Sequence, residues 1–209
     1  MRWFALLLIW PLATWADGER AGQFDYYVMA LSWSPSWCAI EGDARRSPQC
    51  APDADFGWVL HGLWPQYERG WPSYCQTGER NPTRAETAGM ADITGTSGLA
   101  WHAWNKHGRC SGLSADDYFA ASRAAFDAVA KPPVLRQLDA PIRLPARVIE
   151  QAFLEINPGL SADAITITCK SGRIQEARIC LTRDFEPRRC GADVIRDCRM
   201  QDALLDPIR

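Results

Sequence analysis

Eight cysteines constrain this chain of 209 residues more than any other feature of its sequence. They stand at positions 38, 50, 75, 110, 169, 180, 190 and 198, and no two of them are closer than eight residues. An even number of cysteines at such spacings is typical of disulfide-stabilised proteins of oxidising compartments. A structural zinc site would need two closely spaced cysteines or a histidine at ligand spacing. The pattern therefore predicts four disulfides and no metal.

The first sixteen residues predict an export signal. Arg2 precedes the apolar run WFALLLIWPLA, and TWA ending at Ala16 is typical of a cleavage site. The run is shorter than the ~20 apolar residues that span a bilayer. A buried N-terminal helix is the alternative, but Pro11 within the run and the polar DGER after it argue against one. We expect residues 1–16 to be a signal peptide, and residues 17–209 to form one exported domain, periplasmic or secreted, with no membrane segment.

The charge balance limits the kinds of partner that the chain can bind. It has 23 Lys and Arg against 25 Asp and Glu, for a formal net charge of −2, and it has no long basic run. Tight, sequence-independent storage of nucleic acid depends on many phosphate contacts, so this composition argues against it. A compact site that contacts one or two phosphates remains compatible with the sequence.

Periodicity and turn residues predict an α+β fold, with a central antiparallel sheet flanked by helices in a single domain. Strands are expected over 24–33 and over 57–63, with Pro65 stopping the second, and a hairpin is expected over 164–184 with its turn at Ser171-Gly172. Helices are expected over 99–106, 114–131 and 145–157. Residues 39–57 and 67–98 are expected to be loops with little regular structure.

All three histidines lie in two short tryptophan-flanked segments: His61 in WVLHGLWPQ, and His102 and His107 in WHAWNKHGRC. Near neutral pH an imidazole can donate or accept a proton. Two of them on opposite sides of a phosphodiester can take a proton from a hydroxyl and protonate the leaving oxygen. A cation such as Lys106 can offset the charge that develops on the phosphoryl oxygens. On a helix, Ala103, Lys106 and His107 would share one face.

Three other interpretations of these segments stay open at this point. Histidines beside tryptophans are most often packed core or surface residues. Three histidines could hold zinc in a hydrolase, although the ammonium of Lys106 beside His107 would oppose a second cation. A secreted interaction or carbohydrate-binding domain could use exposed tryptophans as a platform, but it would have no use for Lys106.

Two linked segments resemble the signatures of the ribonuclease T2 family: HGLWP at 61–65 and HAWNKHGRC at 102–110. The second signature of the family reads His-Glu-Trp-x-Lys-His-Gly-x-Cys, and the chain differs from it at one defined position. The run YYVMALSWSPSWC is similar to the first strand and the following turn of bacterial members. The C-terminal TCKSGRIQEARICLTRDFEPRRC is similar to their closing hairpin. The resemblance covers essentially all of residues 17–209 and implies a T2-like catalytic domain.

The resemblance implies an endoribonuclease that cleaves single-stranded RNA to 2′,3′-cyclic phosphate ends with low base specificity. His107 would take the proton of the ribose 2′-OH and His61 would protonate the departing 5′-oxygen. Lys106 would stabilise the pentacovalent phosphorane, and His102 would bind the phosphate. No metal or other cofactor is implied, because the nucleophile is internal to the RNA, and DNA would not be cleaved because it lacks the 2′-OH. We expect a monomer.

The resemblance also suggests base-binding residues and a disulfide pattern. Trp64 matches an aromatic residue that stacks on a base, with core packing as the alternative, and stacking tolerates any base. Gln66 stands where some relatives carry an acidic residue that biases base choice, and Trp71 or Tyr67 could complete the pocket. The implied disulfides are Cys75–Cys110, Cys169–Cys198 and Cys180–Cys190, which leaves Cys38–Cys50.

Ala103 is the position where the chain departs from the family pattern, because most relatives have a glutamate there. An alanine can neither polarise a phosphoryl group nor tune the imidazole one turn away. One positioned polar group is typically worth ~10²–10³ in rate. Either the protein is an active enzyme with a slower or compensated step, or it is a catalytically weakened or inactive protein of the same fold that binds RNA or some other partner. We favour the active enzyme, because His61, His102, Lys106 and His107 are all present.

Overall fold

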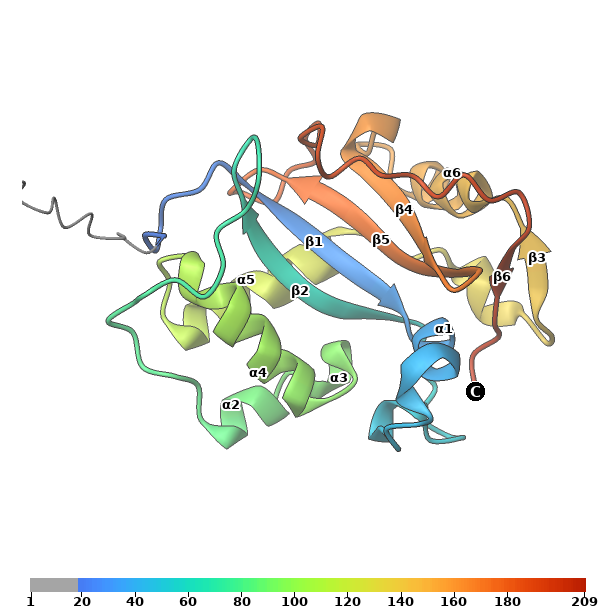
Figure 1. The fold of residues 1–209 in the computed structure, drawn as a ribbon, viewed down its shortest axis with the longest axis horizontal. Coiled ribbons are helices and arrows are strands. Elements are labelled where there is room, and N and C mark those ends of the chain that lie inside the picture. Colours follow the sequence, from blue (N-terminus) through green and yellow to red (C-terminus); the bar gives the residue numbers. More distant parts are fainter. Residues whose placement is uncertain (1–18) are drawn as a thin grey trace, which may run out of the picture.

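A six-stranded sheet runs through the centre of the molecule (Figure 1), in a computed structural model that describes residues 19–209. The expected signal peptide, residues 1–16, lies outside the described residues. The strands are β1 (Tyr26–Trp33), β2 (Trp58–Gln66), β3 (Ile142–Leu144), β4 (Ile165–Lys170), β5 (Arg173–Leu181) and β6 (Ala203–Leu205). Their order is β2-β1-β5-β6-β3, and β4 also pairs with β5. The expected α+β class is confirmed, but the sheet is mixed because the short β5–β6 pairing is parallel.

Helices pack around this sheet: α1 (Ser34–Trp37), α2 (Arg84–Ala88), α3 (Ala91–Thr94), α4 (Ser97–Lys106), α5 (Ala115–Ala128) and α6 (Ala146–Ile156). Figure 1 shows α2 to α5 gathered beside β2, whereas α6 lies beside β4. Side-chain caps fix where α4 and α5 begin. The Thr96 side chain accepts a hydrogen bond from the backbone N–H of Leu99, and Ser114 accepts one from Asp117.

Several element boundaries differ from those expected from the sequence. Strand β2 continues through Pro65 to Gln66, because β2 is an edge strand, where proline's missing N–H leaves no ladder bond unmade. The supposed loop over 67–98 contains α2, α3 and the start of α4, and the loop over 39–57 contains a π-helical turn at Cys38–Gly42. The three-residue strands β3 and β6 were not expected at all.

The hairpin of β4 and β5 turns at Ser171-Gly172, as the sequence predicts. Both turn residues have positive φ values, 50° for Ser171 and 76° for Gly172. This is the backbone conformation that a tight two-residue hairpin turn requires. The turn therefore fixes the register in which β4 pairs with β5.

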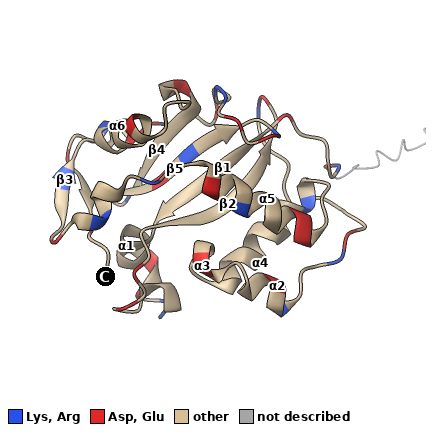
Figure 2. Cartoon of the chain, turned by 180° about the vertical axis from the view of Figure 1, so that it is seen from behind, with Lys and Arg blue, Asp and Glu red and all other residues tan. Residues whose placement is uncertain are grey.

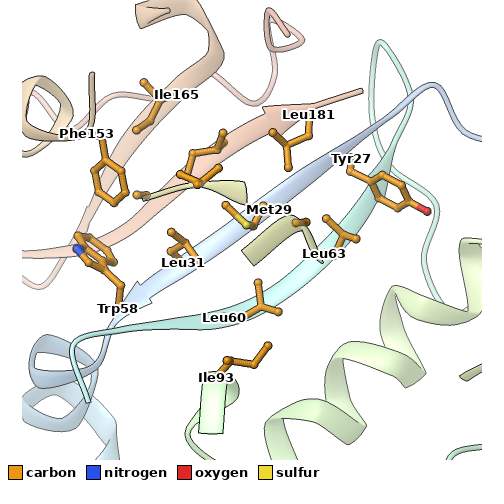
Figure 3. Packing of buried hydrophobic residues seen from close by; sticks show 14 of the residues in the cluster. Tyr27, Met29, Leu31, Trp58, Leu60, Leu63, Ile93, Phe153, Ile165 and Leu181 are labelled. Carbon is orange, nitrogen blue, oxygen red and sulfur yellow. The ribbon is translucent and has the colours of Figure 1, made fainter. Parts of the chain in front are cut away.

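The main hydrophobic core lies on one face of the sheet (Figure 3). Alternate residues of β1 contribute to it, and Leu60 and Leu63 of β2 join them. The core is completed by helix residues that include Trp104 of α4, Tyr118 of α5 and Phe153 of α6. The Tyr118 hydroxyl also donates a hydrogen bond to the backbone oxygen of Leu63 at 3.0 Å. Burial of these aromatic rings therefore fixes α4 and α5 against β2.

The opposite face of the sheet carries different chemistry. Val28 of β1 and Cys180 of β5 form part of a second, small apolar cluster, and Trp64 of β2 packs against it. Seen from behind, the strands show only isolated charged positions (Figure 2). Strands β1 and β2 have no Lys, Arg, Asp or Glu, whereas β5 has Glu176 and Arg178 in its interior.

Four disulfides tie the loops to this framework: Cys38–Cys50, Cys75–Cys110, Cys169–Cys198 and Cys180–Cys190. These are the pairings that the resemblance implies. The second of them joins the segment before α2 to the residues just after α4. Within residues 19–209, no helix combines the length and the apolar character that a membrane crossing demands.

Candidate active site

His61 lies at a β-bulge in the edge strand β2. Ala30 of β1 pairs with Gly62, but the next residue of β1, Leu31, pairs with Leu60, so His61 has no partner in the ladder. The extra residue breaks the alternation of the strand, which is why Leu60 and Leu63 can both enter the core. The bulge thereby turns the His61 imidazole toward the face opposite the core.

Helix α4 brings the other predicted residues to the same place. Its last two turns carry His102 and Lys106, and His107 follows as the C-cap. Together with His61 and Trp64, these residues line a cavity of about 340 Å³. The structure thus brings together two segments that are some forty residues apart in the sequence.

The structure adds two residues that sequence reasoning missed, Glu176 and Arg178 of β5. An oxygen of Glu176 lies 2.5 Å from Nδ1 of His61. The other carboxylate oxygen accepts hydrogen bonds from Arg178 Nε at 3.0 Å and from a terminal guanidinium nitrogen at 2.7 Å. Both residues line the cavity. The signal in the sequence was a Glu-x-Arg pair inside a strand that otherwise reads as a buried hairpin arm.

Glu176 is ionised although it is buried. Its side chain is only 2% exposed. Burial opposes ionisation, but the hydrogen bond and charge of His61, together with the charge and hydrogen bonds of Arg178, outweigh burial and lower the pKa of Glu176 to about 2. A fixed negative charge therefore lies beside Nδ1 of His61 at neutral pH.

His107 has the opposite surroundings. Burial of its ring, followed by the positive charges of Lys106, His61 and His102, lowers the pKa of His107 to about 2. Its buried Nδ1 has no hydrogen-bond partner within residues 19–209, so an imidazolium there would leave a donor unsatisfied. His107 is therefore neutral at neutral pH and can accept a proton.

Trp64 contacts both imidazoles. Its ring stacks on His107 with centroids 5.0 Å apart and an interplanar angle of 20°, and it meets His61 edge-on at 5.3 Å. The guanidinium of Arg178 lies 5.4 Å from the same ring. One face of the indole is thus already occupied by His107. The ring also lines the cavity, so both packing and substrate contact are open to it.

His102 and Lys106 supply the more accessible part of the cavity wall. His102 is the most exposed of the three histidines. Desolvation of the covered part of its ring, followed by the charges of His61 and Lys106, lowers the pKa of His102. Among residues 19–209, no carboxylate forms an ion pair with Lys106, which leaves its ammonium available for an anion. The two side chains can therefore meet a phosphate at the cavity rim.

Of the residues other than Trp64 considered for base binding, two line the cavity and one does not. Gln66 is buried and Trp71 is 50% exposed, and both line the cavity. Tyr67 does not line it and packs instead against the main core. Of the two residues considered for completing a base pocket, only Trp71 therefore lies at the cavity.

Ala103 lies beside the site but does not line the cavity that contains the three histidines. It is buried against Gly62, at a hollow of about 10 Å³ with otherwise mostly apolar walls. A Cβ atom placed on Gly62 would lie 2.6 Å from Trp64 Nε1 and 3.4 Å from Ala103 Cβ. This crowding explains why residue 62 is a glycine. Trp64 Nε1 is buried without a hydrogen-bond partner in the described part of the chain, so a donor close to position 103 has no acceptor.

The zinc-site alternative finds no ligand set in the described residues. No group of three or more His, Cys, Asp or Glu side chains in the described range is arranged to hold a metal ion. All eight cysteines are in disulfides.

Comparison with known proteins places this arrangement in a family. The chain is 46% identical over 124 residues to a ribonuclease of Aeromonas hydrophila, an alignment that covers 56% of this chain and 54% of that protein. It is 36% identical over 120 residues to a probable ribonuclease of Haemophilus influenzae, covering 52% and 44%. The chain spans about half the length of the curated relatives it matches.

Solved structures share the fold at low sequence identity. An RNase-related protein from Calystegia sepium superposes with a TM-score of 0.66 at 17% identity, covering 89% of this chain and 98% of that one. RNase NT, solved in complex with 5′-AMP, superposes with a TM-score of 0.60 at 23% identity, covering 90% and 100%. The model of the ribonuclease T2 family matches residues 24–190. This chain therefore belongs to the ribonuclease T2 family.

Proposed function

We propose that the protein is an endoribonuclease that cleaves single-stranded RNA with low base specificity. The observation that carries the proposal is one cavity lined by His61, His102, Lys106 and His107, with a neutral imidazole at His107 and a carboxylate-bound one at His61. Two titratable groups whose surroundings differ in this way are suited to acid and base roles. The named ribonucleases among the relatives, and the nucleotide bound to RNase NT, support the same substrate class.

The reaction begins with the neutral His107, which takes the proton of a ribose 2′-OH. The 2′-oxygen then attacks the adjacent phosphorus, and the bond from phosphorus to the 5′-oxygen breaks. His61 gives its Nε2 proton to that departing oxygen, so the products are a 2′,3′-cyclic phosphate and a new 5′-OH. The ammonium of Lys106 offsets the charge on the phosphorane, and His102 binds the phosphate. Trp64 and Gln66 would contact the base, the former by stacking.

The proposal extends to cofactor, location and partners. The nucleophile belongs to the RNA, so no metal or other cofactor is needed, and DNA without a 2′-OH is not cleaved. The signal peptide at 1–16 would deliver the domain 17–209 to the periplasm or the medium, where its four disulfides can form. We propose that it acts there as a monomer, free of the membrane.

The test uses the oxidised protein with a short fluorescent RNA in the presence of EDTA. We expect cyclic-phosphate ends, no cleavage at a linkage whose 2′-OH is replaced by hydrogen, and a loss of ~10²–10⁴ in kcat for His61→Ala and for His107→Ala. Asn105→Ala is the matched control, because Asn105 lies on α4 between the site residues but does not line the cavity. RNA binding without cleavage would instead establish the alternative that Ala103 raises, a non-cutting member of the family. Loss of cleavage on adding EDTA would contradict the metal-free reaction.

A further inference from the structure

We propose that Glu176 is the positioning residue of the acid in this reaction: it holds His61 in the orientation and tautomer that deliver a proton to the leaving oxygen, and Arg178 holds Glu176. This inference rests on the proposed function. It assigns a carboxylate from β5 to the site, whereas the family signature places its carboxylate at position 103 on α4.

The contact between Glu176 and His61 is short, and only the imidazole side of it is open to solvent. Glu176 Oε1 lies 2.5 Å from His61 Nδ1, and the imidazole is 34% exposed while the carboxylate is 2% exposed. With Nδ1 donating to the carboxylate, Nε2 is the only ring nitrogen left to meet a substrate. The buried contact therefore sets the tautomer, and the exposed edge of the ring carries the proton that moves.

Hydrogen bonds also keep the carboxylate of Glu176 from turning. Its other oxygen accepts two hydrogen bonds from the guanidinium of Arg178. The hydroxyl of Ser32 on β1 also approaches Oε1, at 3.4 Å. Two charge-assisted hydrogen bonds on one oxygen, together with His61 and Ser32 at the other, hold both ends of the carboxylate. His61 is thus held by a chain of contacts that begins on β5 and not on its own strand.

A β-bulge lies at or beside each of the two residues in this contact. His61 is the unpaired residue of the bulge in β2. In the pairing of β5 with β4, Glu176 pairs with Thr168 but Ile174 pairs with Cys169. Gln175 is therefore the unpaired residue of a second bulge, in β5. Bulges redirect side chains beside functional sites. Here one bulge lies at His61 itself and the other lies next to Glu176.

The buried ion pair of Glu176 is costly for the fold. An ionised carboxylate in this setting is expensive to desolvate, and hydrophobic residues in its place are often at least as stable. Glu176 is the one acidic residue within β1, β2 and β5, the three strands that form this face. An apolar residue would serve packing there, so the carboxylate is explained by its contact with His61.

In the proposed reaction, Glu176 acts on the step in which His61 gives a proton to the leaving oxygen. Before the step, the imidazolium of His61 has hydrogen on both nitrogens, and Nδ1–H donates to the ionised Glu176. When Nε2 gives its proton to the 5′-oxygen, the ring becomes neutral and keeps Nδ1–H, while Glu176 stays ionised throughout. The carboxylate is therefore needed only where the leaving oxygen must be protonated. A leaving group that departs as a stable anion does not need that proton.

The test compares two substrates that share a nucleoside 3′-phosphate. One is a dinucleotide, whose leaving group is a ribose 5′-oxygen, and the other is the 4-nitrophenyl ester, whose leaving group departs unprotonated. We expect Glu176→Gln to lower kcat on the dinucleotide by about 10- to 100-fold, the size of one charge-assisted hydrogen bond, with KM and the nitrophenyl ester nearly unaffected. His61→Ala should show the same split with a larger loss, whereas His107→Ala should lose both substrates.

Controls separate this role from folding. Glu176→Asp keeps the charge and should recover part of the dinucleotide rate, and Glu150→Gln makes the same chemical change on α6, away from the cavity, and should change neither rate. Thermal unfolding and complete disulfide formation confirm that each variant is folded. Equal slowing of both substrates by Glu176→Gln, or slowing of neither, overturns the inference and leaves the proposed function intact. Failure of the wild-type protein on both substrates overturns the proposed function and the inference with it.

Discussion

His61 and His107 are alike in the sequence, each following a tryptophan-containing stretch and preceding a glycine, but their surroundings in the structure differ. His61 lies on an edge strand, is partly open to solvent and touches an ionised carboxylate. His107 caps a helix, is 5% exposed and faces the positive charges of Lys106, His61 and His102. A buried carboxylate lies against Nδ1 of His61, whereas burial and the neighbouring positive charges oppose an imidazolium at His107. In the reaction proposed above, this difference is what suits His61 to the role of acid and His107 to the role of base.

This contrast changes how Ala103 is understood. A glutamate at 103 would lie one turn before His107, on the helix that carries the base. In the described part of the chain, α4 has no acidic residue, and the cavity instead has the carboxylate of Glu176 beside His61. The missing glutamate thus removes a charge that would favour protonation of His107, and Glu176 supplies one where a proton is to be given.

Lys106→Met tests the base side most severely. We expect a loss of ~10²–10³ in kcat, because a positioned cation no longer offsets the charge on the phosphorane. Lys106 also helps to lower the pKa of His107, so the acidic limb of the pH–rate profile should move to higher pH. Lys106→Arg, which keeps the charge, should leave that limb in place. A loss of rate with an identical shift in both variants would contradict the assignment.

Ala103→Glu sharpens the comparison by returning the carboxylate to α4. The added charge should raise the pKa of His107 and move the acidic limb upward by about one pH unit, a loss of ~10-fold on the acidic side. Ala103→Gln is the matched neutral control and should not move the limb, although either side chain could accept a hydrogen bond from Trp64 Nε1. A faster Ala103→Glu enzyme at every pH would show that the alanine is a handicap.

The smallest effect is on the pH dependence of stability. Folding lowers the pKa of His107 from 6.5 to about 2. Between these pH values only the unfolded chain binds the proton, so the free energy of unfolding falls as the pH drops below about 6.5. The contribution of Glu176 is present above its ordinary value of 4.5 and is lost as the pH falls from there to about 2. Each group contributes up to ~1.4 kcal/mol per pH unit in its window.

Denaturant titrations at a series of pH values distinguish the contributions of His107 and Glu176 to the free energy of unfolding. His107→Gln should flatten the slope over the whole range from about pH 6.5 to about pH 2, whereas Glu176→Gln should flatten it only between about pH 4.5 and pH 2. Other titrating groups cancel when each variant is compared with the wild-type protein. An unchanged slope for His107→Gln between about pH 6.5 and pH 4.5 would show that His107 is not held neutral by the fold.

The sequence predicted the parts of the molecule whose signals are local. The α5 cap at Ser114, the hairpin turn at Ser171-Gly172 and the grouping of the three histidines each depend on a few neighbouring residues, and the structure has all of them. The expected end of β2 at Pro65 was wrong because sheet position, which the sequence does not state, decides whether proline is tolerated.

Glu176 could not be found from the sequence for a related reason. Its partner His61 lies 115 residues away, and the contact depends on bulges that shift the alternation of β2 and of β5. A strict two-residue period would place residues 60 and 62 on one face, whereas in the structure Leu60 and Leu63 share it. A charged residue inside an otherwise buried strand was the one available clue.

The central claim, that the fold holds His107 neutral and ties His61 to Glu176, is tested most directly by NMR of the three imidazoles in isotopically labelled protein. We predict that the His107 ring stays neutral through about pH 4, in keeping with a pKa of about 2. We also predict a strongly downfield His61 Nδ1–H proton that Glu176→Gln abolishes while the fold is retained. Protonation of His107 near 6.5, or a His61 Nδ1–H signal that survives Glu176→Gln unchanged, would contradict the account.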